Sequence, residues 1–199
     1  KHKNAMKRKL ILGLAFFITI TSCKKIIDSA GNFGGEDAVK IEDLKIISVA
    51  DKYTMAVPEY MTELKSLNDD ASFQYANIYK ETYTIVINEN KQDFIDAFKE
   101  IEIYNDSLSP LDNYSDYQIK STKESMDNGE YKKLNTKIRN LDSNQYEVSG
   151  KTEGIDVNYF VSFIESDEDV YMIMSWTLKN RYKKYKNTFK LIQNSFKIK

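Results

Sequence analysis

The chain offers little of the chemistry on which many enzymes depend. It contains one histidine, His2, and one cysteine, Cys23, both near the N-terminus. A catalytic triad, a histidine-ligated zinc ion and a histidine general base each need an imidazole placed among other polar groups. No glycine-rich phosphate-binding motif is present, and seven glycines leave little room for one. The residue types therefore argue against histidine or cysteine catalysis and against nucleotide binding.

Carboxylates are the remaining candidates for catalysis. Two acidic runs stand out, Glu165–Asp169 and Asp69–Asp70. The first could hold a hard cation through oxygen ligands, but it lacks the residue order of a calcium loop, and a solvated hairpin turn explains it better. A carboxylate hydrolase would need two such groups about 5–10 Å apart in a cleft, a separation that no sequence displays. We expect no catalytic residue, no metal site and no cofactor.

Cys23 has another chemistry open to it, because it follows an export signal. An apolar run, Leu10–Ile20, is preceded by Lys7, Arg8 and Lys9. This order is typical of a secretory signal peptide, and the run is too short to span a bilayer. The segment Ile20-Thr21-Ser22-Cys23 resembles the lipobox of bacterial lipoproteins. That resemblance implies a signal peptide with an upstream extension over residues 1–22 and a palmitate-bearing lipid anchor on Cys23. An ordinary signal peptide followed by a free thiol, or a buried cysteine in a short helix, are the alternatives.

Cleavage before Cys23 would change the composition of the protein. His2 would be lost and the only thiol would be blocked by lipid. Five of the 29 basic residues and none of the 30 acidic ones would be removed, so the net charge would fall from −1 to about −6. Such an acidic protein is a poor nucleic-acid binder. The composition resembles that of Bacteroidetes-type lipoproteins, and Lys24 after the cysteine favours the outer over the inner membrane by resemblance to the enteric sorting rule.

The remaining chain divides into a tether and one globular domain. Residues 24–40 contain Gly31, Gly34 and Gly35 and show no apolar period, so residues 23–40 are predicted to be a lipidated cysteine and a flexible tether. Fully extended, the tether could span at most about 55–60 Å. Residues 41–199 are long enough to bury a core as a single domain.

Alternating apolar and polar residues predict an antiparallel sheet in this domain. Within Ile155–Glu165 five alternating apolar residues, from Ile155 to Phe163, share one face with polar residues such as Asp156 and Asn158 between them, which predicts a half-buried strand. Val170–Leu178 is apolar on both faces and is therefore expected to be a central strand with helices on either side. The fold class is thus predicted to be α+β. The other predicted strands cover residues 46–50, 53–57, 72–77, 82–88, 132–140 and 145–150, the first two as a hairpin.

Capping signals predict two helices in the middle of the chain. Asn90 is a good N-cap for an amphipathic helix that contains Phe94 and Phe98. Ser109-Pro110 begins a second helix, which is expected to stop near Asn128-Gly129. Its thin apolar stripe, chiefly Leu111, Tyr114 and Tyr117, predicts weak packing at the surface.

The C-terminal segment predicts a third helix with two distinct stripes. Apolar residues recur three and four positions apart from Tyr182 to Phe196. A separate stripe carries Lys179, Lys183, Lys186 and Lys190, in a segment with eight basic residues and no acidic one after Leu178. A solvated face is the simpler interpretation. The alternative is contact with anionic lipid or with an acidic partner.

The order of these parts resembles the PsbP-like superfamily, which includes the extrinsic photosystem protein and the DcrB lipoproteins. The resemblance covers residues 46–196 and lies in the segments Tyr53–Met61 and Leu67–Asn77, the Trp176 strand and the closing Asn194-Ser195-Phe196. It implies an antiparallel sheet between helices, a PsbP-like α/β/α sandwich. It implies no activity, since members act as assembly or binding factors.

Three functions follow as hypotheses. The first is a non-catalytic, membrane-anchored factor of the cell envelope that binds a protein partner or assists assembly of a complex. The second is a carrier or sensor of a small apolar ligand lined by Phe163, Met172 and Met174. The third is a carboxylate hydrolase. Trp176 and a surface group of Tyr60, Tyr75 and Tyr79 are further candidates for ligand contact, with a core role favoured for Trp176.

Overall fold

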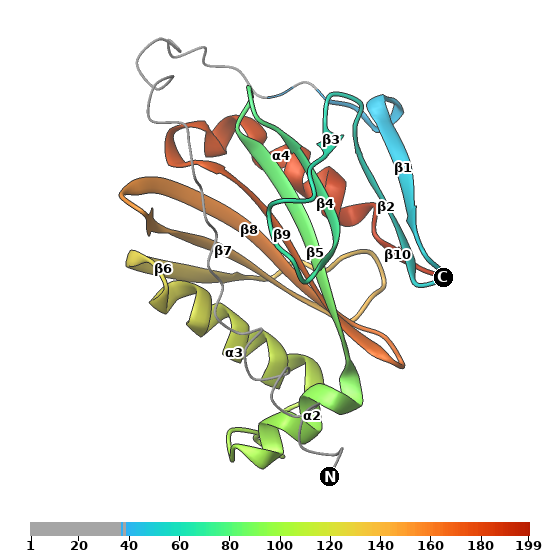
Figure 1. Ribbon diagram of the computed structural model, residues 1–199, viewed down its shortest axis with the longest axis vertical. Coiled ribbons are helices and arrows are strands. Elements are labelled where there is room, and N and C mark those ends of the chain that lie inside the picture. Colours follow the sequence, from blue (N-terminus) through green and yellow to red (C-terminus); the bar gives the residue numbers. More distant parts are fainter. Residues whose placement is uncertain (1–36, 38) are drawn as a thin grey trace.

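A computed structural model of the protein describes Asp37 and residues 39–199 (Figure 1). In this part of the chain two antiparallel sheets and three α-helices form a layered α+β fold, as predicted. The elements in chain order are η1 Ile41–Asp43, β1 Leu44–Val49, β2 Tyr53–Pro58, β3 Thr62–Glu63, β4 Ala71–Asn77, β5 Thr82–Asn90, α2 Lys91–Glu100, α3 Pro110–Glu124, β6 Asp127–Leu134, β7 Ser143–Thr152, β8 Ile155–Glu165, β9 Asp169–Leu178, η2 Lys179–Arg181, α4 Tyr182–Asn194 and β10 Lys197–Ile198.

The larger sheet is organised around β9. Its strand order is β3-β4-β5-β9-β8-β7-β6, so β9 has a neighbour on each side and lies in the middle. The predicted hairpin of β1 and β2 is present, but it belongs to a separate three-stranded sheet with β10. Periodicity within one strand does not say which sheet the strand joins, and this second sheet was not predicted.

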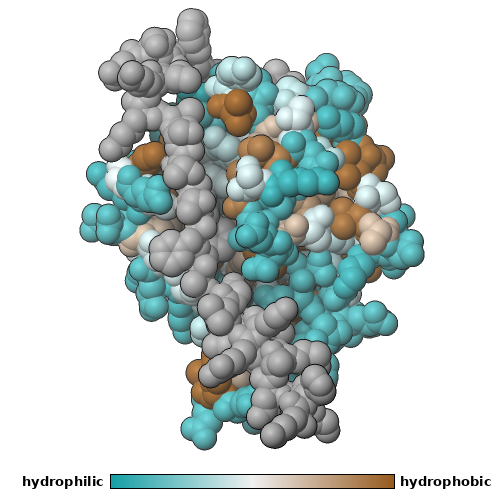
Figure 2. Space-filling view, viewed as in Figure 1, coloured by the Kyte–Doolittle hydropathy of each residue, from teal (hydrophilic) through white to brown (hydrophobic). Residues whose placement is uncertain are grey.

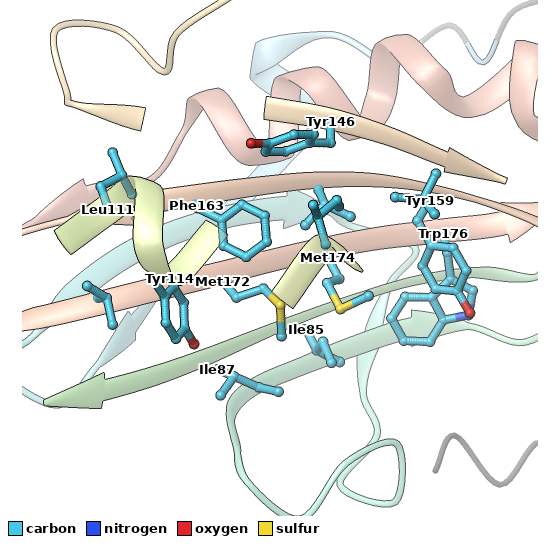
Figure 3. Packing of buried hydrophobic residues seen from close by; sticks show 14 of the residues in the cluster. Ile85, Ile87, Leu111, Tyr114, Tyr146, Tyr159, Phe163, Met172, Met174 and Trp176 are labelled. Atoms are coloured by element: carbon cyan, nitrogen blue, oxygen red, sulfur yellow. The ribbon is translucent and has the colours of Figure 1, made fainter. Parts of the chain in front are cut away.

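Both faces of the larger sheet are covered. One face packs against α2 and α3, with Phe163 and Met174 among its buried residues (Figure 3). The other packs against α4 and β2, with Phe160 and Ile173 inside. The strand that was expected to be central is buried from Asp169 to Thr177. Apolar residues on both faces of β9 thus require a covering layer on each side, and the chain supplies both.

The second helix differs from its prediction. α3 ends at Glu124 rather than near Asn128-Gly129, and it contacts three strands, β6, β7 and β8. The expected weak packing was wrong because Ile119 joins Leu111 and Tyr114 as a buried residue.

The short connection after α3 has a steric cause. A Cβ at Gly129 would lie 2.2 Å from the carbonyl oxygen of Lys123, so only glycine allows the strand to begin this close to the helix. β6 therefore covers residues 127–134 instead of the predicted 132–140, and the loop that follows buries Ile138.

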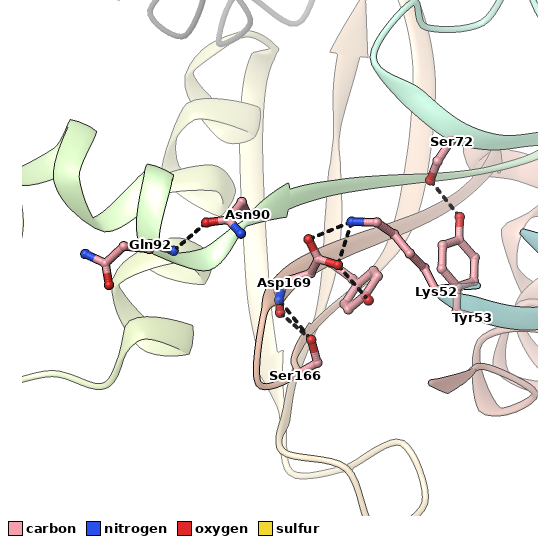
Figure 4. A network of polar contacts seen from close by, with 8 residues as sticks. Lys52, Tyr53, Ser72, Asn90, Gln92, Ser166 and Asp169 are labelled. Atoms are coloured by element: carbon pink, nitrogen blue, oxygen red, sulfur yellow. Dashed lines mark hydrogen bonds and ion pairs between the residues drawn. The ribbon is translucent and has the colours of Figure 1, made fainter. Parts of the chain in front are cut away.

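Both predicted N-caps are present. The side chain of Asn90 accepts hydrogen bonds from the backbone of Gln92 and Asp93 at 3.0 and 3.1 Å (Figure 4). Ser109 accepts one from the backbone nitrogen of Asp112 at 3.0 Å, with Pro110 at the first helical position. These local signals were readable because a cap depends on residues two or three positions apart.

A buried polar side chain fixes α4 against the sheet. Gln193 is fully buried and donates from Nε2 to the carbonyl of Phe160 at 2.7 Å and to Ser175 Oγ at 3.2 Å. Its Oε1 accepts a hydrogen bond from Ser162. Because every polar atom of the amide has a partner, any sliding of α4 would break several buried hydrogen bonds at once.

Replacing Gln193 should therefore destabilise the domain strongly. Gln193→Ala removes the side-chain amide, so the buried Phe160 carbonyl, Ser162 and Ser175 each lose a hydrogen-bond partner. The free energy of unfolding should therefore fall by about 2–4 kcal/mol. Urea denaturation measures this change. The control is Gln92→Ala on the exposed side of α2, which should change stability by no more than about 0.5 kcal/mol. Equal midpoints for the two variants would contradict the role assigned to Gln193.

Candidate functional site

Several predicted features lie outside the described residues. They are His2, the signal segment, Cys23 and most of the tether, so the lipid anchor stays a prediction. In the described part, no helix is long and apolar enough to cross a membrane. The same part contains no cluster of three or more histidine, cysteine or acidic side chains that could hold a metal ion.

The acidic run at Glu165–Asp169 forms the turn between β8 and β9, and two of its carboxylates make structural contacts. Glu165 accepts from Lys91 Nζ at 3.0 Å and from the backbone nitrogen of Leu111 at 3.1 Å. These bonds connect the beginnings of α2 and α3 to the end of the larger sheet. Carboxylates at helix N-termini are favoured by the helix dipole as well.

Asp169 makes the corresponding connection to the smaller sheet. Its carboxylate, 7% exposed, accepts from Lys52 Nζ at 2.9 and 2.7 Å, and Lys52 lies in the β1–β2 turn (Figure 4). Tyr171 donates a longer bond of 3.3 Å to the same carboxylate. Burial raises the pKa of Tyr171 to about 12, and the Asp169 charge adds to that effect while Ser166 opposes it. The run is thus a structural turn, as the sequence favoured.

One partly buried carboxyl group outside these runs has a raised pKa. Glu89, near the end of β5, accepts a hydrogen bond of 2.8 Å from the hydroxyl of Tyr114 on α3. Burial raises the pKa of Glu89 above its usual value, Tyr114 partly offsets this, and the charge of Asp70 raises it further. Sequence patterns did not single out Glu89, because its burial depends on α3 packing over the strand.

The three residues predicted to line a ligand are together, but in a packed core. Phe163, Met172 and Met174 lie on one face of β8 and β9 and are at most 4% exposed (Figure 3). The ring of Phe163 makes edge contacts with Tyr114 at 5.9 Å and Tyr146 at 5.8 Å between centroids. A ligand here would have to displace these rings, so the ligand-lining role stays a prediction.

The tyrosine candidates separate in the structure. The ring of Tyr75 lies tilted against that of Phe73, with 4.6 Å between their centroids. Tyr60 is half buried, and Tyr79 is 85% exposed at the β4–β5 turn. Trp176 is in the core as favoured, 3% exposed and stacked on Tyr83 at 5.2 Å.

The four candidate lysines do not form one uniform stripe. Lys179 lies in η2, before α4 begins, while Lys183, Lys186 and Lys190 lie in the helix. Lys186 is ion-paired with Glu147 on β7. Among the described residues, Lys179, Lys183 and Lys190 have no anionic partner, so these three remain available for contact with an outside anion.

A polar cluster around Asp37 was not predicted from the sequence. Asp37 accepts hydrogen bonds from Tyr60 at 2.6 Å and Thr188 at 3.0 Å, and its backbone nitrogen donates to the Lys184 carbonyl at 2.9 Å. Lys80 lies 3.6 Å from the same carboxylate. Burial, together with the Asp37 charge, raises the pKa of Tyr60 above its usual range.

This cluster joins the N-terminal side of the domain to α4. Asp37, which falls within the segment that was predicted to be tether, therefore contacts the folded domain. No pattern in the sequence signals such a contact, because its partners come from residues 60, 80 and 188 and are brought together only by the fold.

Comparison with known proteins found only distant similarity. No protein-family model and no curated protein match the chain. Among solved structures, cyanobacterial PsbP (CyanoP) from Synechocystis sp. has a TM-score of 0.46 at 14% identity, over 85% of this chain and 100% of that one. LpqN of Mycobacterium tuberculosis, described as involved in cell envelope biogenesis, has a TM-score of 0.47 at 9% identity, over 73% and 82%. A Pseudomonas aeruginosa protein of unknown function has a TM-score of 0.44 at 12% identity, over 74% and 91%. At these levels the similarity supports no conclusion about activity.

The environment of Glu89 gives a pH-dependent stability prediction. Because its folded pKa is raised, wild-type Glu89 favours folding at low pH and this contribution is lost as pH rises through the folded pKa. Glu89→Gln keeps an acceptor for Tyr114 without the charge, so at pH 7 the variant should be as stable as wild type or more stable by about 1 kcal/mol.

Denaturant unfolding at pH 7 and pH 4 measures the effect. The advantage of Glu89→Gln should shrink at pH 4, where the wild-type carboxyl group becomes protonated. The control is Glu130→Gln on the exposed strand β6, which should behave like wild type at both pH values. A clear loss of stability for Glu89→Gln at pH 7 alone would show that the ionised carboxylate is required.

Proposed function

We propose that the protein is a non-catalytic binding or assembly factor of the cell envelope, anchored to a membrane by lipid on Cys23. The observation that carries the proposal is the placement of two features at opposite ends of the domain. One is the Asp37 cluster beside α4, where the chain from Cys23 enters the fold. The other is the α2–α3 loop, which lies at the far end of the long axis (Figure 1).

The α2–α3 loop presents apolar side chains to solvent. Ile101, Ile103 and Leu108 are 47, 41 and 38% exposed. Apolar residues gathered on one exposed loop are typical of a protein–protein contact. Their position away from the tether suits a partner that approaches from the side opposite the bilayer.

The loop is held in one conformation by a buried side chain. Asn113 of α3, 6% exposed, donates to the carbonyls of Asn105, Leu108 and Ser109 at 3.0, 3.3 and 3.1 Å. Its Oδ1 accepts from the backbone nitrogen of Asn105 at 2.8 Å. A loop that is already ordered loses little conformational entropy on binding, which favours affinity. The partner would offer an apolar pocket for these three side chains.

The anchor is part of the same proposal. A signal peptide that ends in a lipobox-like segment, a lone cysteine and a short tether describe a lipoprotein of the outer membrane. In this proposal the tether joins the domain at Asp37 beside α4, at the end opposite the apolar loop.

Metabolic labelling tests the anchor. Cells that express the wild-type chain or Cys23→Ala are fed labelled palmitate, and the labelled protein is followed through membrane fractionation. Wild type should be labelled and recovered with the outer membrane, whereas Cys23→Ala should carry no label. Equal labelling of the two proteins would disprove lipid attachment at Cys23.

Site-specific crosslinking tests the partner face. A photo-crosslinking amino acid is placed at Ile103 and, as a control of similar exposure, at Tyr131 on β6, which is 42% exposed. Irradiation in cells should yield an adduct with one envelope protein from position 103 and not from position 131. The adduct should disappear when Leu108→Asp is added. The same set of adducts from both positions would contradict a partner site on the loop.

A further inference from the structure

We infer that the domain rests on its own bilayer through a defined patch, the tether-side face, which binds anionic lipid headgroups. The tether-side face consists of Ile78 and Tyr79 in the β4–β5 turn, together with Lys179, Lys183 and Lys184 at the beginning of α4. The inference deepens the proposed function, on which it rests for the lipid anchor.

The apolar part of this face is an exposed turn. Ile78 is 57% exposed and Tyr79 is 85% exposed. Figure 2 shows apolar surface near the top of the molecule, at the β4–β5 turn, next to hydrophilic surface. An aliphatic and an aromatic side chain at the tip of a turn suit the boundary between headgroups and acyl chains, where Tyr is enriched.

Contacts beneath the turn hold these two side chains outward. The side chain of Asn77 accepts from the backbone nitrogen of Lys80 at 2.8 Å and donates to the Tyr60 carbonyl at 2.8 Å. Arg181 donates to the carbonyls of Tyr79 and Lys80 at 3.4 and 3.2 Å. The exposure of Ile78 and Tyr79 therefore belongs to an ordered turn, which is joined directly to the beginning of α4.

The positive side chains at the beginning of α4 disfavour the helix, because a helix dipole is positive at its N-terminus. The first turn has no acidic residue, and the helix has no side-chain N-cap. Lys179, Lys183 and Lys184 lie near this positive end of the helix dipole, where anions are favoured and cations are not. An external anion would relieve that repulsion, so the arrangement is better suited to binding than to folding.

Nearby acidic groups do not neutralise these lysines. Glu81 pairs with Arg181 at 3.2 Å, and Asp37 lies 3.6 Å from Lys80. Within the described residues, Lys179 and Lys183 have no anionic partner, and the Lys184 ammonium lies over the Tyr185 ring, 5.5 Å from its centroid. The positive charge of the face is thus left for a ligand.

The position at which the tether joins the domain favours a lipid bilayer as the ligand. Asp37 is bound to Lys80 beside the turn and to the Lys184 carbonyl of α4, so the chain from Cys23 enters on this same face. Thirteen residues lie between Cys23 and Asp37, so the distance between these two residues is at most about 50 Å. A lipid anchor on this segment therefore brings the face within reach of the membrane, where each lysine near an anionic surface favours contact by about 5-fold.

A fluorescent label at position 79 tests the inference in the full chain. Tyr79→Cys offers one free thiol when Cys23 carries lipid, and it is labelled with the environment-sensitive dye NBD. The protein is reconstituted into vesicles of phosphatidylcholine alone or of phosphatidylcholine with phosphatidylglycerol. NBD emission should shift to shorter wavelength and be quenched by spin-labelled lipid only in the vesicles that contain phosphatidylglycerol. A label at Tyr131→Cys should keep the emission of an aqueous dye in both kinds of vesicle.

Charge removal provides the matched control. Adding Lys179→Gln and Lys183→Gln should lower the ratio of bilayer-bound to aqueous label about 25-fold at low salt. High salt should lower the same ratio for the protein that keeps both lysines, because salt screens their attraction to the anionic lipid. Lys120→Gln and Lys123→Gln, at two exposed positions of α3, make the same change in net charge. This second pair should leave the ratio of bilayer-bound to aqueous label unchanged. An aqueous label at position 79 in anionic vesicles, or equal losses in both double variants, would overturn the inference.

The same samples separate this inference from the anchor. Labelling of Cys23 by NBD in the wild-type chain would show that it carries no lipid, which would overturn the proposed anchor. With Cys23→Ala added, so that position 79 again carries the only thiol, the label would then still report whether the tether-side face binds anionic vesicles added from outside.

Discussion

Burial of both faces of the β8–β9 hairpin is the constraint on which the rest of the structure depends. β9 is buried almost along its whole length, so neither face of the sheet could be left to water. Removing a large apolar side chain from water contributes about 1.5–3 kcal/mol, and β8 and β9 together bury many such side chains. Helices α2 and α3 on one face, and α4 with the smaller sheet on the other, follow from that requirement.

The turn of this hairpin also joins the three layers at one end. Glu165 receives hydrogen bonds from Lys91 and from the backbone of Leu111, at the beginnings of α2 and α3. Asp169 receives Lys52 from the smaller sheet. Buried and partly buried charges of this kind are costly without partners, so each of these pairs fixes the arrangement of the layers around it. The acidic run that might have suggested chemistry is therefore explained by assembly of the fold.

The two ends of the domain differ in a way that suits a tethered binding factor. At one end, Asp37 is held by Lys80 and α4, and an exposed Tyr79 lies beside lysines that have no anionic partner among the described residues. At the other end, Asn113 orders a loop with exposed apolar residues. Under the proposed function, the positive and apolar groups of the first end would contact an anionic membrane and the second end would bind a protein.

Local patterns in the sequence determined much of this architecture. The central position of β9, the two caps and the apolar stripe of α4 were predicted correctly because each depends on residues within a few positions. The half-buried strand predicted for Ile155–Glu165 was wrong, because Phe160 and Ile164 on its second face are buried under α4 and the smaller sheet. The near absence of histidine and cysteine is a matter of composition alone, and the export signal stays a prediction from the sequence. Only the tertiary structure decided the extent of α3 and β6, the pairing of Lys186 with Glu147, and the burial of Glu89. It alone also placed Asp37 against α4. These features join residues up to about 150 positions apart, as in Asp37 and Thr188, and no periodicity or spacing along a chain encodes which distant side chains its folding will bring into contact.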